Sequence, residues 1–296
     1  MLRRAVIHTF PSVIVLVAFL LRVYRLDAQS LWWDEGHSIA MASAPLAQIA
    51  TQPGMDVHPP GYFLILHFWM GMVGMREYAL RYLSVFFSVL TVALMLRLAR
   101  TLSNVTAIGC GMLAALLPLH VAYAQEVRMY ALVTCLTALS GYAQWRILFH
   151  DPSRRWWGLY VLATAANLYT HYFALFIIAF QGLVWVIWII ASRGDALQRL
   201  RRVWLTALAV VILFAPQWPL ALQQTTAYAN PNLRPPTWDE FLARSWRAYT
   251  VGLNIYPAWG YLEGIMAWLT VAAVGLWMWR GGMRAVQWGY WAGWLC

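Results

Sequence analysis

The sequence has no lysine, few acidic residues and very little cysteine. Only 11% of its 296 residues are charged, and the 21 basic residues, all of them arginine, outnumber the 11 acids. Because soluble domains carry about 25% charged residues, this composition excludes a soluble globular protein. Cys110 and Cys135 lie inside apolar runs and Cys296 is the last residue, without CxxC spacing. These cysteines are too few to predict a disulfide framework.

Apolar runs make up most of the chain. Hydrophobic residues account for 62% of it, and the mean hydropathy is +0.58. Runs long enough to cross a membrane lie at about residues 5–21, 80–96, 105–123, 129–148, 156–169, 172–190, 203–222 and 262–279, and another begins at Ala285. We expect an all-α, polytopic membrane protein with about eight to nine spans. The arginines lie between these runs and do not cluster on a polar face, so no nucleic-acid partner is expected.

The first apolar run resembles a secretory signal peptide because Arg3 and Arg4 precede it. However, Arg22 and Arg25 follow it directly, and no small-x-small cleavage site precedes Gln29. We therefore expect the run to be retained as the first membrane span.

Residues 59–75 form a short apolar segment that fits either a further span or an interfacial helix. If the segment lies on the membrane surface, most arginines fall on the cytoplasmic side. If it crosses the membrane, the distribution inverts, against the positive-inside rule. We therefore expect an interfacial helix, a cytoplasmic N-terminus and a multi-pass protein of the plasma (inner) membrane. Most acids then lie on the outer side, so chemistry that uses carboxylates is expected to be extracytoplasmic.

Two long outer loops follow from this topology, at about residues 23–79 and 223–261. Long loops in compact proteins are usually functional, so we expect the active site there. We divide the chain into a catalytic transmembrane module, residues 1–222, and a second part, residues 223–296. The second part holds the other long outer loop and C-terminal spans that we expect to be truncated.

The first outer loop contains an acidic pair, Asp34 and Glu35, directly after Trp32 and Trp33. Adjacent tryptophans anchor a chain at the membrane interface and would hold the carboxylates at headgroup depth. Partial desolvation there raises the pKa of a carboxylate toward that of a useful general base. The alternative is a solvated acidic pair that balances the nearby arginines.

Asp56 and His58 lie farther along the same loop, where Pro59 and Pro60 precede the interfacial segment. A helix start offers backbone N–H groups to an anion, so His58 would face a phosphate. Alternatively, the prolines only punctuate a loop and His58 is solvated. A divalent cation would be held by Asp34, Glu35, His37, Asp56 and His58, but their spacing fits no recognised metal signature.

Three further charged residues lie at the outer ends of predicted spans. Arg81 suits bidentate phosphate recognition, or it pairs with Glu77 one helical turn earlier. Glu126 and Arg128 lie in a very short outer connection and act on a substrate or form a simple ion pair.

Two other outer segments have simpler explanations. Residues 167–172 are rich in side chains that can hydrogen-bond to a sugar, but turn formation alone explains them. The second acidic pair, Asp239 and Glu240, follows Thr237 in a capping box. We expect an outer amphipathic helix over residues 237–252 and assign this pair to structure.

The combination of these motifs is more specific than any one of them. Trp32-Trp33-Asp34-Glu35, His58-Pro59-Pro60, Ala79-Leu80-Arg81 and residues 124–130 together resemble the protein O-mannosyltransferase and aminoarabinose transferase superfamily. These are GT-C membrane glycosyltransferases of the glycosyltransferase family 39 type. The resemblance covers about residues 3–222 and implies juxtamembrane helices in the first outer loop.

The resemblance implies a function. Such enzymes transfer a sugar, with inversion, from a polyprenyl-phosphate donor to an acceptor hydroxyl of a glycolipid, polysaccharide or protein at the extracytoplasmic face. They need no cofactor, and their partners are membrane lipid, the donor and an acceptor that the sequence does not identify. By motif, Asp34 corresponds to the general base, Glu35 to its neighbour in the acidic pair and Glu126 to the acidic residue of the second outer loop. His58 begins the His-Pro-Pro motif.

Chemistry alone assigns the remaining site residues. Arg81 and Arg128 are expected to bind the donor phosphate, and His37 and Asp56 are further substrate-binding candidates.

The competing class is a non-catalytic membrane protein, either a transporter or flippase of a lipid-linked substrate or an inactive truncated homologue. A transporter predicts charged residues at mid-span, whereas the span interiors here hold no carboxylate.

Overall fold

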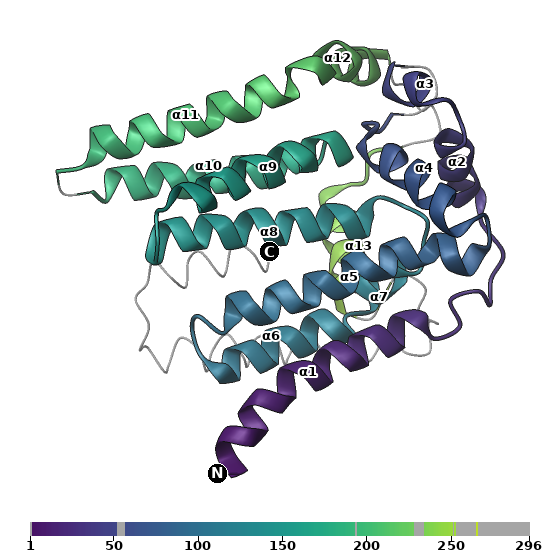
Figure 1. Ribbon diagram of the computed structural model, residues 1–296, viewed down its shortest axis with the longest axis horizontal. Helices are drawn as coiled ribbons and strands as arrows, with labels where there is room; N and C mark the ends of the chain where they lie inside the picture. Colours follow the sequence, from purple (N-terminus) through teal and green to yellow (C-terminus); the bar gives the residue numbers. More distant parts are fainter. Residues whose placement is uncertain are drawn as a thin grey trace. The chain divides into compact units, whose positions relative to one another are not determined.

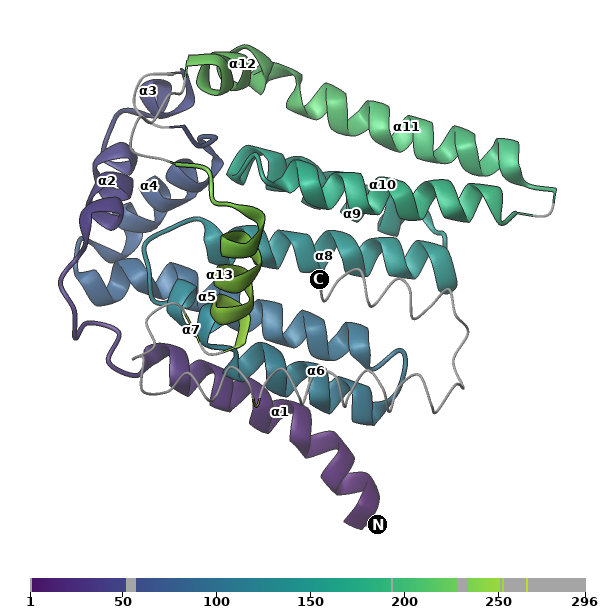
Figure 2. The ribbon, with the colours of Figure 1, turned by 180° about the vertical axis from the view of Figure 1, so that it is seen from behind.

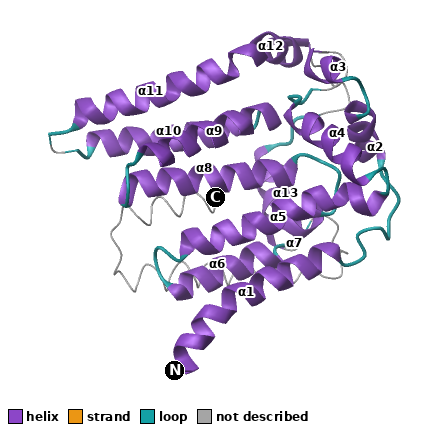
Figure 3. Ribbon diagram, viewed as in Figure 1, coloured by secondary structure: helices purple, strands orange, loops and turns teal. Residues whose placement is uncertain are grey.

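The computed structural model describes residues 2–51, 57–192, 194–227 and 234–250, together with residues 252 and 265. The chain divides into two compact units, one of Met1–Leu116 with His120–Asn230 and one of Leu117–Leu119 with Pro231–Cys296. Figure 1 shows long helices of the first unit lying side by side, and Figure 2 shows the same arrangement from behind. All regular structure in the described ranges is helical, as predicted (Figure 3).

The long helices form the body of the first unit. They are α1 (Leu2–Val23), α5 (Glu77–Ala99), α6 (Asn104–Leu116), α8 (Tyr130–Phe149), α9 (Arg154–Thr170), α10 (Ala174–Ile190) and α11 (Ala196–Phe214). Shorter elements connect or extend them: α2 (Trp33–Ala42), α3 (Leu46–Thr51), α4 (Gly61–Val73), α7 (Pro118–Ala124), η1 (Ala215–Gln217) and α12 (Trp218–Ala227). The second unit contains α13 (Trp238–Thr250).

Helix α4 covers most of the apolar segment that fits either a span or an interfacial helix. It has 13 residues and is therefore about 20 Å long, too short for a hydrocarbon core of about 30 Å. It packs against α2 and α3 at one end of the long helices (Figure 1). The segment is thus a short helix at the end of the bundle, and its position at the membrane interface stays a prediction.

The number of membrane spans is only partly established. Within the described residues, Glu77–Ala99 and Ala196–Thr226 are long and apolar enough to cross a membrane, and the bent pair of α6 and α7 is a third candidate. Shorter apolar helices lie at Thr9–Val23 and Ala174–Ile190. The remaining spans of the expected eight or nine stay a prediction, and those after residue 262 lie outside the described residues apart from residue 265.

The third apolar run is broken, although the sequence predicts one continuous span over residues 105–123. Helices α6 and α7 meet at an angle of 55°. Pro118 has no N–H to donate to Ala114, so the helical hydrogen-bond ladder is interrupted there. The Arg22 guanidinium replaces it by donating to the carbonyl oxygens of Ala114 and Ala115, each at 3.0 Å.

Arg22 is therefore expected to be a major structural residue. Its side chain is fully buried and also donates to Ser88 Oγ at 2.7 Å. We expect Arg22→Met to destabilise the protein by about 2–5 kcal/mol, because buried carbonyl groups lose their donor. Thermal unfolding in detergent would measure this, with exposed Arg25→Met as the matched control. Equal unfolding temperatures for the two variants would contradict the prediction.

A close contact brings the start of α4 and the end of α9 together. A Cβ atom added to Gly61 would lie 2.5 Å from the carbonyl oxygen of Tyr169. Only glycine allows the start of α4 to approach the end of α9 this closely. The contact places His58, just before α4, beside the turn that follows α9.

Candidate active site

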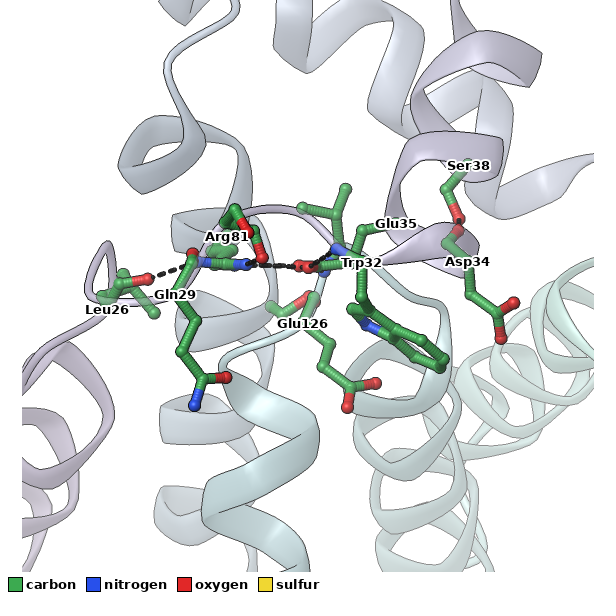
Figure 4. A network of polar contacts seen from close by, with 11 residues as sticks. Leu26, Gln29, Trp32, Asp34, Glu35, Ser38, Arg81 and Glu126 are labelled. Atoms are coloured by element: carbon green, nitrogen blue, oxygen red, sulfur yellow. Dashed lines mark hydrogen bonds and ion pairs between the residues drawn. The ribbon is translucent and has the colours of Figure 1, made fainter.

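Glu35 and Arg81 form a buried ion pair at the end of the bundle. Arg81 Nη2 lies 2.7 Å from Glu35 Oε2, and Arg81 Nε donates to Oε1 at 2.8 Å. Glu35 also accepts hydrogen bonds from the backbone N–H groups of Val127 (2.9 Å) and Trp32 (3.3 Å). Figure 4 shows this network from close by. One carboxylate thus joins α2, α5 and the loop between α7 and α8.

All five N–H donors of Arg81 are used within the protein. Besides Glu35, they reach the carbonyl oxygens of Leu26, Gln29 and Ser30. In the structure Arg81 thus pairs with Glu35, 46 positions away in the sequence, in place of Glu77 one helical turn away.

Asp34 has very different surroundings from Glu35. Its side chain is 38% exposed, and Figure 4 shows the carboxylate pointing away from the Glu35–Arg81 pair. Asp34 Oδ2 lies 3.9 Å from Arg128 Nη2. Arg128 is almost fully buried and donates to Ser38 Oγ at 3.2 Å, while its Nε has no partner. The site thus places the accessible carboxylate of Asp34 near the buried guanidinium of Arg128, whose Nε–H group has no hydrogen-bond acceptor.

Glu126 lies in the loop between α7 and α8 and is partly buried. Burial is the main cause that raises the pKa of its carboxyl to about 7, and the negative charge of Glu35 adds to it. Its Oε2 is enclosed without a hydrogen-bond partner. Near neutral pH the carboxyl group of Glu126 is therefore partly protonated, whereas a carboxyl group in water is ionised.

This pKa predicts a pH dependence of stability. In the folded protein Glu126 titrates at about 7, against 4.5 for the free group, so its contribution to stability is complete below pH 4.5. That contribution is lost as the pH rises from 4.5 to 7. We expect Glu126→Gln to flatten the fall in unfolding temperature over this interval, and Glu240→Gln to leave it unchanged. An unaltered slope in the Glu126 variant would refute the assignment.

Histidines from two segments far apart in the sequence meet beside Tyr130. The rings of His58 and His171 are 4.9 Å apart in an edge-to-face contact, and Tyr130 lies 6.1 Å from His171. The Phe173 N–H donates to His171 Nδ1 at 3.1 Å, so a neutral His171 carries its proton on Nε2. Arg128 lies over the Tyr130 ring at 5.7 Å. In the sequence, turn formation alone explains His171, and only the fold places it next to His58.

The two remaining substrate-binding candidates are His37 and Asp56. His37 is half-buried on α2, and Asp56 lies outside the described residues. No group of three or more His, Cys, Asp or Glu side chains in the described ranges is arranged to hold a metal ion.

In the second unit, the predicted capping box is confirmed, because the Thr237 N–H donates to Glu240 Oε2 at 3.2 Å.

An apolar groove of about 630 Å³ runs between α9, α10 and α11. Its lining is almost entirely hydrophobic and reaches Trp218 and Thr225 on α12. Tyr172, also in the lining, donates to Gln224 Oε1, and Gln224 Nε2 donates to the carbonyl oxygen of His58 at 3.0 Å. One end of the groove is thus hydrogen-bonded to the histidine cluster.

Comparison with protein families shows which family the chain belongs to. Residues 57–219, more than half of it, match the family described as dolichyl-phosphate-mannose-protein mannosyltransferase. The chain belongs to this family. The segment that matches the mannosyltransferase family contains His58, Arg81, Glu126 and Arg128. Asp34 and Glu35 precede the segment, so their place in the site depends on the geometry described above.

A solved structure shows the same fold. The Saccharomyces cerevisiae protein O-mannosyltransferase Pmt1-Pmt2 complex bound to the sugar donor is similar with a TM-score of 0.53 and 16% identity. The likeness covers 75% of this chain and 33% of the yeast chain, so this member of the mannosyltransferase family spans about a third of the yeast chain's length. Comparison with curated protein sequences found no match. Family and fold together confirm the resemblance to GT-C membrane glycosyltransferases.

Proposed function

We propose that the chain is an inverting glycosyltransferase that moves a sugar from a polyprenyl-phosphate donor to an acceptor hydroxyl. Family membership supports this donor class. The proposal is carried by the contrast between two adjacent carboxylates. Glu35 is enclosed and neutralised by Arg81, whereas Asp34 is accessible beside a buried arginine. The first can hold the loop in place while the second can reach a substrate.

Glu35 acts, on this proposal, as a positioning residue. Its place in the acidic pair predicts a catalytic residue, but its two oxygens already accept hydrogen bonds from Arg81, Trp32 and Val127. The burial of Glu35 fixes the first turn of α2, and Asp34 is its neighbour in that turn. Asp34 therefore faces the substrate from a rigid helix end.

Arg128 is the group that we assign to the donor phosphate. Arg81 has no donor left, whereas Arg128 Nε is without a partner. A guanidinium suits phosphate oxygens because its planar donors can bind two of them. His58 and His171 add imidazole groups next to Tyr130. Glu126, when protonated, places no negative charge against the phosphate.

The apolar groove is the place that we assign to the polyprenyl tail. It follows α10 for most of its length and ends beside the residues that connect to His58. A groove of 630 Å³ with such an apolar lining suits a hydrocarbon chain better than a sugar. Tail and phosphate would thus be bound by adjoining parts of one unit.

The reaction follows from these positions. Asp34 removes the proton of the acceptor hydroxyl as that oxygen attacks the anomeric carbon from the side opposite the phosphate. The bond between carbon and phosphate oxygen breaks, and polyprenyl phosphate leaves with the electron pair. Arg128 stabilises the negative charge on the leaving phosphate. Attack from the opposite side inverts the configuration at the anomeric carbon.

The test is a transfer assay with the full chain in lipid vesicles. Several labelled polyprenyl-phosphate sugars, mannose among them, and labelled GDP-mannose are offered separately with a panel of acceptors. We expect label transfer and equimolar release of polyprenyl phosphate from the lipid-linked donor only. Transfer from GDP-mannose, or none from any lipid-linked sugar by folded protein, would reject the proposal.

A further inference from the structure

A second cavity lies far from the acidic pair, between α1, α5 and α6. It measures about 380 Å³, within the range of about 300–1,000 Å³ that is typical of ligand sites. Arg97 is 16 residues beyond Arg81 on α5, or about 24 Å along the helix axis. The cavity therefore lies at the opposite end of a span, near the other face of the membrane.

The cavity combines cationic and apolar surfaces. Arg97 and Arg100 line it with exposed side chains, and Ser12 and Asn104 add polar groups. The rest of the lining is apolar: Pro11, Val15, Ala93, Leu96, Ala107 and Ile108. No acidic side chain contributes to this lining. Such a surface suits a molecule with an anionic head and a hydrocarbon tail.

Arg97 and Arg100 have no counter-ion among the residues that the structure describes. Neither forms an ion pair with an acid in the described ranges, in contrast to Arg81, Arg128 and Arg155. Asn104 begins α6, and the first turn of a helix carries partial positive charge. The positive charge at the cavity is thus left for a ligand to neutralise.

We propose that this cavity binds an anionic glycerophospholipid of the surrounding membrane. The lipid phosphate contacts Arg97 and Arg100, and an acyl chain lies against the wall formed by Val15, Leu96 and Ile108. Basic pockets between membrane helices favour anionic headgroups in this way. The bound lipid would join α1 to the turn between α5 and α6.

The experiment is native mass spectrometry of the purified full chain with phosphatidylglycerol or phosphatidylcholine of identical acyl chains. We expect phosphatidylglycerol to bind more tightly to the wild type, and R97Q/R100Q to weaken its binding by about 10- to 30-fold. The matched control is R201Q/R202Q, which removes two exposed arginines of α11. It should keep the wild-type preference.

Two further measurements test whether binding needs the cavity itself or only the positive charge, and whether it needs the acyl chain or only the phosphate. Ala93→Phe keeps the arginines but fills the cavity, and it should weaken the binding of phosphatidylglycerol. Glycerol 3-phosphate should compete poorly because it has no acyl chain. The proposal is overturned by equal binding of the two lipids, by equal losses in both double variants, by normal binding to Ala93→Phe, or by effective competition from glycerol 3-phosphate.

Discussion

Asp34→Asn is expected to lower the rate of sugar transfer by about 10²–10⁴-fold, the usual contribution of a general base. Asparagine keeps the shape of the side chain but cannot accept the hydroxyl proton at neutral pH. The contacts of Arg128 with Ser38 and the ring of Tyr130 do not depend on the charge of Asp34. Donor binding should therefore change little, and the loss should be in kcat.

Initial rates at saturating donor and a separate donor displacement assay would measure the two effects. Asp27→Asn is the matched control, since Asp27 is exposed in the same outer loop and carries the same charge. A variant of Asp34 that turns over close to wild type would show that another group removes the proton. A large loss of donor affinity with normal kcat would make Asp34 a binding residue instead.

Breaking the Glu35–Arg81 pair should have the largest effect on stability. We expect Glu35→Gln to destabilise the protein by about 3–5 kcal/mol, because it leaves the Arg81 charge buried without a partner. Arg81→Met should be at least as damaging, since the carbonyl oxygens of Leu26, Gln29 and Ser30 also lose their donor. The double variant should recover only part of the loss.

Thermal unfolding of the single and double variants gives the coupling between the two residues. Arg155→Met is the control, because Arg155 and Asp151 also lie 2.8 Å apart but on the surface. That variant should unfold near the wild-type temperature, since exposed ion pairs contribute little. Additive losses for Glu35 and Arg81 would show that their contact does not stabilise the fold.

Local sequence patterns predicted the local features correctly. A short apolar helix within residues 59–75 and the capping box of α13 were both predicted, because an apolar run and a capping signal act over a few residues. The break at Pro118 was missed. A hydropathy average over residues 105–123 hides one proline in an apolar run, and the compensating hydrogen bonds come from Arg22, far away in the sequence.

In the site, the sequence likewise predicted which residues matter but not which of them are in contact. The sequence identified Asp34, Glu35, Arg81 and Arg128 as candidates because charges are rare in this chain. It did not show which of them pair, since Glu35 and Arg81 are 46 positions apart and their contact depends on how the first outer loop folds. Nor did it show that His171 packs against His58.

The four hydrogen bonds to Glu35 also have a consequence for biosynthesis. Their donors lie in α5, in the loop before α8 and next to α2, so the last donor, Val127, is made well after the acid itself. A nascent chain that ends before Val127 cannot complete this network. The segment around Glu35 therefore cannot reach its final form while ribosomes are still translating α5 or α6.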